Sequence, residues 1–275
     1  MNDFDWSNRP SGKLNVGGAM LEYACFGPAP GEAPTIVMLH EGLGCVELWR
    51  DVPKRIADRT GFGVFVYSRQ GYGRSDPVVL PRPLDFQTRE ALGPLPGLLD
   101  KIGFRKGILL GHSDGATIAA IYAGSIEDHR VRGLILMAPH FFTEEMGLAA
   151  IAGARESFAT TDLASRMAKY HDDPEGAFRG WADVWLDPDY RVWNVTDVID
   201  YLRIPTLAIQ GREDQYGTLA QLEALEERSY APVDTLVLEN CKHSPHLEYP
   251  DLVLDAIADF TARLTRIEAA SVEPA

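Results

Sequence analysis

The sequence has few basic residues and no basic run. Lys and Arg total 26 against 40 Asp and Glu in 275 residues, which gives a formal net charge of −14. Proteins that bind nucleic acid need clustered lysine and arginine to displace counterions from phosphates. This charge balance argues against a polyanionic partner, and we expect no nucleic acid among the partners of this chain.

A long apolar run is also absent. No stretch approaches the ~20 apolar residues of a membrane span, and residues 1–6 lack the positive and apolar regions of a signal peptide. The chain has only three cysteines, Cys25, Cys45 and Cys241, at unrelated spacings. That pattern disfavours a disulfide framework and a zinc site. We therefore expect a cytoplasmic protein with no membrane partner and no metal or other cofactor.

Strand and helix patterns alternate along the chain. With 45% hydrophobic residues, the 275 residues can bury one substantial core. Strand patterns occupy 20–26, 35–39, 63–67, 107–110, 133–137, 205–210 and 234–238, and helix patterns occupy 46–59, 85–102, 114–125, 219–229 and 250–266. Gly93-Pro94 should break the second helix, and residues 271–275 should form a frayed tail. The alternation predicts an α/β fold with a mostly parallel sheet covered on both faces.

The most informative segment is Gly-His-Ser-Asp-Gly at residues 111–115. It lies directly between the strand pattern at 107–110 and the helix pattern at 114–125. A strand that turns straight into a helix strains the central residue, and flanking glycines let the two backbones approach each other. Ser113 is therefore expected at the exposed tip of the turn, where it can serve as a nucleophile.

Two later strand patterns end in the residues that such a serine needs. The pattern at 205–210 is followed by Asp214, and the pattern at 234–238 is followed by His243. A serine hydroxyl becomes nucleophilic when an imidazole takes its proton, and the imidazole needs a carboxylate to fix its tautomer and stabilise its cation. The chain order predicts a triad with Ser113 as nucleophile, His243 as base and Asp214 as the orienting acid.

These segments resemble the α/β-hydrolase superfamily over nearly the whole chain. Further matches are Leu-His-Glu-Gly-Leu-Gly at 39–44, Gly-Tyr-Gly-Arg-Ser at 71–75 and His-Ser-Pro-His at 243–246. The resemblance implies an eight-stranded, mostly parallel sheet with helices on both faces and a helical cap inserted after the sixth strand. It divides the chain into a core of residues 1–139 and 204–275 and a cap of residues 140–203, where only helix signals occur.

The resemblance also implies an oxyanion hole. Its donors are expected to be the Gly42 N–H, with Leu43 as the alternative, and the Asp114 N–H at the start of the helix. Glu41 departs from the family pattern, because most relatives have the first glycine of a His-Gly pair there. We interpret Glu41 as a surface residue beside the hole; the alternative is that it contacts a cationic or hydroxylated substrate.

Other histidines and acids compete for these roles. His246 lies three residues beyond His243 and is the alternative base. His40 and His112 begin or flank turns and are interpreted as structural, while Glu213 should point away from the triad. The prediction therefore keeps His243 as the base.

The predicted function is hydrolysis of a small carboxylic ester, thioester or lactone through an acyl-enzyme on Ser113. One alternative is hydrolysis of a carbon–carbon bond in an aromatic ring-cleavage product, where an arginine would hold the substrate carboxylate; the candidates are Arg69, Arg155, Arg166 and Arg191. Perhydrolase or acyltransferase activity is another, and a non-catalytic binding protein with the same fold is the alternative from a different class. The expected partner is a small molecule, and the sequence leaves the oligomeric state open, a homodimer included.

Overall fold

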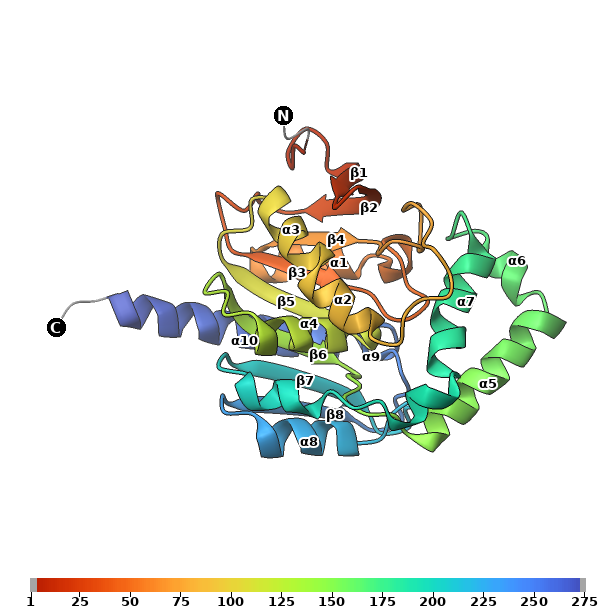
Figure 1. Cartoon of the computed structure of the whole chain (residues 1–275). Coiled ribbons are helices and arrows are strands. Elements are labelled where there is room, and N and C mark those ends of the chain that lie inside the picture. The colour runs from red at the N-terminus through yellow and green to blue at the C-terminus, as the bar shows by residue number, and fades with distance from the viewer. Residues whose placement is uncertain (1–3, 273–275) are drawn as a thin grey trace.

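The computed structural model describes residues 4–272, which form one eight-stranded sheet (Figure 1). The strands are β1 Ser11–Val16, β2 Ala19–Phe26, β3 Thr35–Leu39, β4 Gly63–Tyr67, β5 Gly107–His112, β6 Val131–Met137, β7 Thr206–Gly211 and β8 Val233–Leu238. Their order in the sheet is β1-β2-β4-β3-β5-β6-β7-β8. Strand β2 is antiparallel to both of its neighbours, and the pairs from β4 to β8 are parallel. The predicted mostly parallel sheet is confirmed.

Helices cover both faces because side chains alternate along each strand. The helices are α1 Val52–Thr60, α2 Phe86–Leu92, α3 Pro94–Lys101, α4 Asp114–Ser125, α8 Ala220–Arg228, α9 Pro245–Glu248 and α10 Pro250–Val272, with a short 3-10 helix, η1, at Glu47–Trp49. On β3, Val37 and Leu39 pack in an apolar layer with α2, α3, α4 and α8. Ile36 and Met38 pack in a second layer with α1 and α10. Parallel strands buried on both faces read as continuous apolar runs, which is why the sequence revealed them.

The differences from the predicted elements lie at edges and breaks. Strand β1 was not predicted, because only Leu14 and Val16 of its six residues are buried. The helix predicted over 46–59 is interrupted at Arg50, whose φ is 55°. The predicted break at Gly93-Pro94 is confirmed, since α2 ends at Leu92 and α3 begins at Pro94. The predicted tail at 271–275 is wrong for residues 271 and 272, which belong to α10, and residues 273–275 lie outside the described part.

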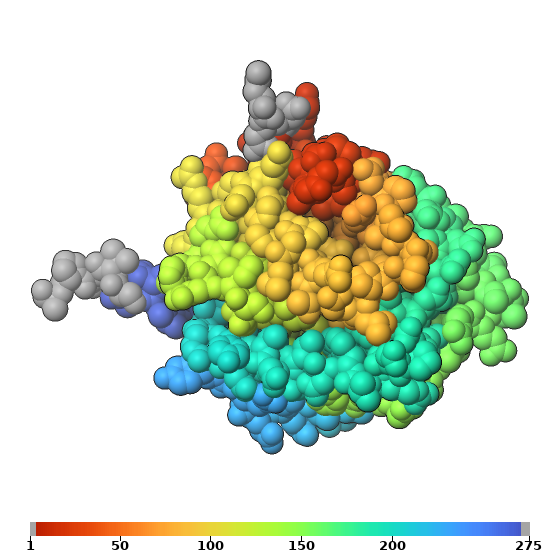
Figure 2. Space-filling model, viewed as in Figure 1, coloured from red at the N-terminus to blue at the C-terminus, as the bar shows by residue number. Residues whose placement is uncertain are grey.

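Between β6 and β7 the chain forms helices only: α5 Glu145–Thr160, α6 Leu163–Met167, α7 Pro174–Trp185, and the 3-10 helices η2 Pro188–Val192 and η3 Thr196–Tyr201. We call residues 140–203 the cap segment. Its helices α5, α6 and α7 lie on the right-hand side of the molecule in Figure 1, and the same side is green in Figure 2. Its aromatic and apolar side chains form a third cluster with Tyr72 and Phe86 of the core. Helix η3 differs, because its Ile199 packs with α4 in the core layer. The last part of the predicted cap therefore packs with the core.

Within residues 4–272, no helix is both long and apolar enough to cross a bilayer.

Candidate active site

Ser113 occupies the turn between β5 and α4. Its φ of 54° and ψ of −120° put a non-glycine residue in a strained backbone conformation. A Cβ on Gly111 would lie 2.3 Å from the Gly115 carbonyl oxygen, and a Cβ on Gly115 would lie 2.1 Å from the Leu39 carbonyl oxygen. Only glycines permit this close approach of strand and helix, which presents the Ser113 hydroxyl at the carboxyl edge of the sheet.

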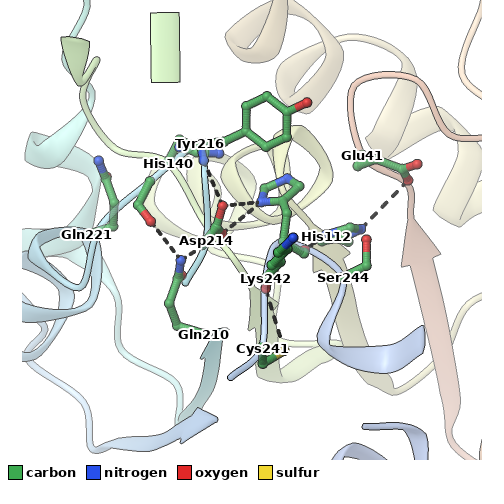
Figure 3. A network of polar contacts seen from close by, with 12 residues as sticks. Glu41, His112, His140, Gln210, Asp214, Tyr216, Gln221, Cys241, Lys242 and Ser244 are labelled. Atoms are coloured by element: carbon green, nitrogen blue, oxygen red, sulfur yellow. Dashed lines mark hydrogen bonds and ion pairs between the residues drawn. The ribbon is translucent and has the colours of Figure 1, made fainter. Parts of the chain in front are cut away.

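Asp214 and His243 are joined through both carboxylate oxygens. His243 Nδ1 lies 2.9 Å from Asp214 Oδ1 and 2.8 Å from Oδ2. The carboxylate also accepts hydrogen bonds from Gln210 Nε2 and from the Tyr216 backbone N–H, each at 2.8 Å (Figure 3). Because a carboxylate only accepts, we assign the proton of His243 to Nδ1, which leaves Nε2 as an acceptor. That is the tautomer that a base for a serine hydroxyl requires.

Asp214 is buried and still favours its ionised form. Burial acts to raise its pKa, but the contact with His243 and the hydrogen bond from the Tyr216 N–H together lower the pKa below its ordinary value. A carboxylate anion at this position stabilises the imidazolium that forms when His243 takes a proton.

Ser113 and His243 line the same cavity, whose volume is about 270 Å³. The lining residues come from both the core and the cap segment: Glu41, Gly42, Leu43, Ser113, His140, Glu144, Gly147, Ile151, Trp181, Trp185, Gln215, Tyr216, His243 and Ser244. Within residues 4–272 the hydrogen bonds of the His243 ring go to Asp214. In ligand-free enzymes the contact between serine and histidine is often long and tightens with substrate.

The expected oxyanion loop is held from behind by Arg69. Its guanidinium donates through Nη1 to the His40 carbonyl oxygen and through Nη2 to the Glu41 carbonyl oxygen, the latter at 3.0 Å. His40 accepts the Arg69 N–H at Nε2 (3.0 Å) and donates from Nδ1 to the Glu41 carbonyl (2.7 Å). Burial and the Arg69 charge keep the pKa of His40 well below its ordinary value, so the ring is neutral. These bonds engage two successive carbonyls of the loop, so the backbone just before the expected donor at Gly42 is held in place.

Gly42 is also the point where the cap meets this loop. A Cβ at residue 42 would lie 2.3 Å from Trp181 Cδ1 and Nε1, so the indole of α7 packs directly on the glycine. Trp181 lines the cavity and is 8% exposed. The absence of a side chain at residue 42 therefore lets the cap close over the loop.

Asp114 has a second role that the sequence did not indicate. Its Oδ1 accepts hydrogen bonds from Gln87 Nε2 at 2.9 Å and from Trp185 Nε1 at 3.3 Å, while Oδ2 has no partner within residues 4–272. Burial raises the pKa of Asp114, and the charge of Arg69 opposes the rise only in part. Because Trp185 lies on α7, this carboxyl group connects α4 to the cap segment.

Two residues of the cavity were missed by the sequence analysis. His140 follows β6 and lies with its ring centroid 5.8 Å from that of His243; burial and then the charge of His243 lower its pKa to about 3. Tyr216 stacks edge-on against His243 with centroids 4.7 Å apart. Both residues follow the ends of parallel strands, and this position is the sequence signal that could have indicated them as site residues.

The residues that the sequence offered as alternatives to His243 and Asp214 have other surroundings. His246 is 4% exposed and packs against Trp49 and His112, with ring centroids 4.9 and 4.8 Å away. His112 Nε2 lies 2.6 Å from the His243 carbonyl oxygen, to which it donates. Glu213 is exposed. The contact with Asp214 is therefore made by His243 and not by the alternative base.

None of the four candidate arginines lines the cavity. Arg69 is bound to backbone carbonyls, Arg166 lies 3.3 Å from Asp162, and Arg191 lies 2.6 Å from Glu145. Within residues 4–272 there is also no cluster of three His, Cys, Asp or Glu side chains that could hold a metal ion.

The sequence matches one protein family over most of its length and resembles proteins of known function. The Alpha/beta hydrolase family matches residues 36–256. Epoxide hydrolase B of Mycobacterium tuberculosis is 25% identical over 228 residues, which is 81% of this chain and 60% of that protein. The chain thus spans about 60% of the length of this relative.

Solved structures with low identity share the fold. The enol-lactonase of Burkholderia xenovorans LB400 has a TM-score of 0.72 at 21% identity, over 91% of this chain and 100% of that one. A meta-cleavage product hydrolase from Pseudomonas fluorescens IP01 has a TM-score of 0.69 at 19% identity, over 92% and 97%. Since the family match extends over most of the sequence, the chain belongs to the alpha/beta hydrolase family.

Proposed function

We propose that this chain is a serine hydrolase that cleaves small carboxylic esters, thioesters or lactones through an acyl-enzyme. The observation that carries the proposal is the contact of His243 Nδ1 with both oxygens of Asp214, beside a strained Ser113 that lines the same cavity. The cavity suits a small acyl group, because about 270 Å³ is at the low end for ligand pockets. A cytoplasmic location, also proposed, fits three cysteines that are all unpaired.

The proposed reaction follows from this arrangement. Ser113 Oγ attacks the acyl carbon as His243 Nε2 takes its proton, and the N–H groups of Gly42 and Asp114 stabilise the oxyanion. His243 returns the proton to the departing alcohol, thiol or ring oxygen. Water then attacks the acyl-enzyme with His243 as base, and the carboxylic acid leaves as Ser113 regains its proton.

The charge of the cavity argues against hydrolysis of a carbon–carbon bond in a ring-cleavage product. Such a substrate carries a carboxylate. Among the residues that the structure describes, the charged side chains that line the cavity are Glu41 and Glu144, and none is a lysine or arginine. A carboxylate placed there would meet like charge without a cationic partner.

The nucleophile argues against epoxide hydrolysis, despite the names of the relatives in sequence. Attack of a serine oxygen on an epoxide carbon forms an ether, which lacks the acyl carbon that water attacks in the second step. Attack of Ser113 on an ester instead forms an acyl-enzyme that water can hydrolyse.

A fluorophosphonate probe and a short p-nitrophenyl ester test the proposal. We expect one label per wild-type chain, located at Ser113 by mass spectrometry, and loss of both label and turnover in Ser113→Ala. Ser244→Ala removes another hydroxyl from the same cavity and should still be labelled once. Absence of labelling together with absence of turnover in the wild type would support the non-catalytic binding protein, and turnover that survives in Ser113→Ala would contradict the proposed nucleophile.

A further inference from the structure

The Glu41 carboxylate is a charged group of the cavity that the proposed hydrolysis does not use. Its side chain is 30% exposed and lines the cavity, next to the residue expected to supply an oxyanion donor. Its nearest cationic candidate is His112, whose Nδ1 lies 3.7 Å from Glu41 Oε2, beyond hydrogen-bond distance (Figure 3). His112 donates its Nε2–H to the His243 carbonyl, and its Nδ1 has no hydrogen-bond partner within residues 4–272.

The other carboxylate of the cavity is fully occupied by contrast. Glu144 accepts hydrogen bonds from the Thr218 N–H at 2.9 Å, from Thr218 Oγ1 at 2.7 Å and from Gln221 Nε2 at 2.7 Å. These bonds connect the residue before α5 with Thr218 and with the first turn of α8. Glu144 therefore has a structural role, and Glu41 is the carboxylate left to meet a ligand.

Glu41 carries a negative charge at neutral pH. Burial acts to raise its pKa, but the His112 ring that faces the carboxylate holds the pKa below its ordinary value. An anion beside the expected oxyanion hole opposes the charge that develops on the substrate oxygen, unless a cation lies against it. The aromatic walls of the same cavity, Trp181, Trp185 and Tyr216, offer ring faces of the kind that attract organic cations.

We propose that the substrate of this site carries an alkylammonium or quaternary ammonium group, which lies against Glu41 and the aromatic walls while the acyl carbon meets Ser113. This inference names the substrate class and rests on the proposed hydrolysis. The cation neutralises Glu41 as the oxyanion forms, so the same contact contributes to binding and to the transition state.

Pairs of esters that differ only in charge test this directly. Acetylcholine and 3,3-dimethylbutyl acetate have the same shape and place the charge on the alcohol; ethyl 4-aminobutyrate and ethyl pentanoate place it on the acyl group. In at least one pair, we expect the wild-type kcat/KM for the cationic ester to exceed that for its neutral partner on the order of tenfold. Glu41→Gln keeps the size of the side chain and should bring that ratio close to one.

The matched control is Glu145→Gln, which also removes one negative charge but lies on the surface, paired with Arg191. It should leave the ratio unchanged. A second measurement needs neither turnover nor a variant: choline should protect Ser113 of the wild type from the fluorophosphonate at lower concentration than 3,3-dimethylbutanol does.

The outcomes separate the two proposals. If both neutral esters are cleaved through Ser113 at least as fast as their cationic partners, and choline protects no better than the alcohol, the ammonium substrate is wrong and the serine hydrolase stands. A ratio that falls equally in Glu145→Gln would mean that overall charge, and not Glu41, gives the preference. If Ser113→Ala retains turnover of these esters, the proposed hydrolysis itself fails.

Discussion

The core side and the cap side of the cavity are built in different ways. The core side consists of tight turns whose polar groups bond to one another, as in the contacts of Asp214 with His243, Gln210 and Tyr216. The cap side contributes mainly rings, above all Trp181 and Trp185. Backbone geometry and hydrogen bonds therefore position the proposed catalytic groups, whereas the shape of the cavity depends on side chains that pack onto it from the cap.

The largest effect is expected from breaking the core side. Asp214→Asn and His243→Ala should each lower kcat on the order of 10³- to 10⁴-fold, because the base loses its orientation or is removed. Steady-state hydrolysis of p-nitrophenyl acetate measures this. Glu213→Gln, beside the acid but exposed, is the matched control. If His246→Ala showed the large loss and His243→Ala the small one, the base would be misassigned.

The second prediction concerns the contact between the two sides. Gly42→Ala should lower kcat/KM on the order of 10²-fold, because the new methyl group would collide with Trp181 and shift an expected oxyanion donor. Adding Trp181→Ala removes the collision and should recover part of the activity. A double variant as poor as Gly42→Ala alone would show that the indole is not the cause.

The third prediction concerns stability. His140 is buried with a pKa of about 3, below the ~6.5 of an unfolded histidine. Between these values only the unfolded chain binds the proton, so stability is full above pH ~6.5 and falls as the pH decreases toward 3. In His140→Gln, urea unfolding between pH 4.5 and 5.5 should show that the free energy of unfolding changes less steeply with pH, by about 1.4 kcal/mol per pH unit. His129→Gln, at an exposed position, serves as control, and an unchanged slope in His140→Gln would contradict the prediction.

The smallest effect is expected at the cysteines. Burial raises the pKa of Cys45 and of Cys241 to about 12, and all three thiols are buried. Iodoacetamide should therefore leave the activity of the folded protein unchanged and modify all three thiols only in urea. Rapid inactivation with label on Cys241, which lies close to His243 in the sequence, would show that this loop opens in solution.

Much of the core was predictable because its signals are local. The turn at Ser113 follows from two glycines between an apolar strand and an apolar helix, and the structure places the strain where the sequence indicated. The broken helix follows from Gly93-Pro94. Strand β1 was missed because an edge strand buries few side chains, so its sequence has little apolar pattern.

By itself, the sequence determined the order of the strands along the chain, the tight turn at Ser113 and the two strand ends that precede Asp214 and His243. Only the tertiary structure decided that His243 and not His246 meets Asp214, that Asp114 bonds to Trp185, and that Glu41 faces the cavity. The physical reason is the separation along the chain between the residues that interact. Backbone turns depend on neighbours in sequence, whereas the direction of a side chain depends on partners that only folding brings near.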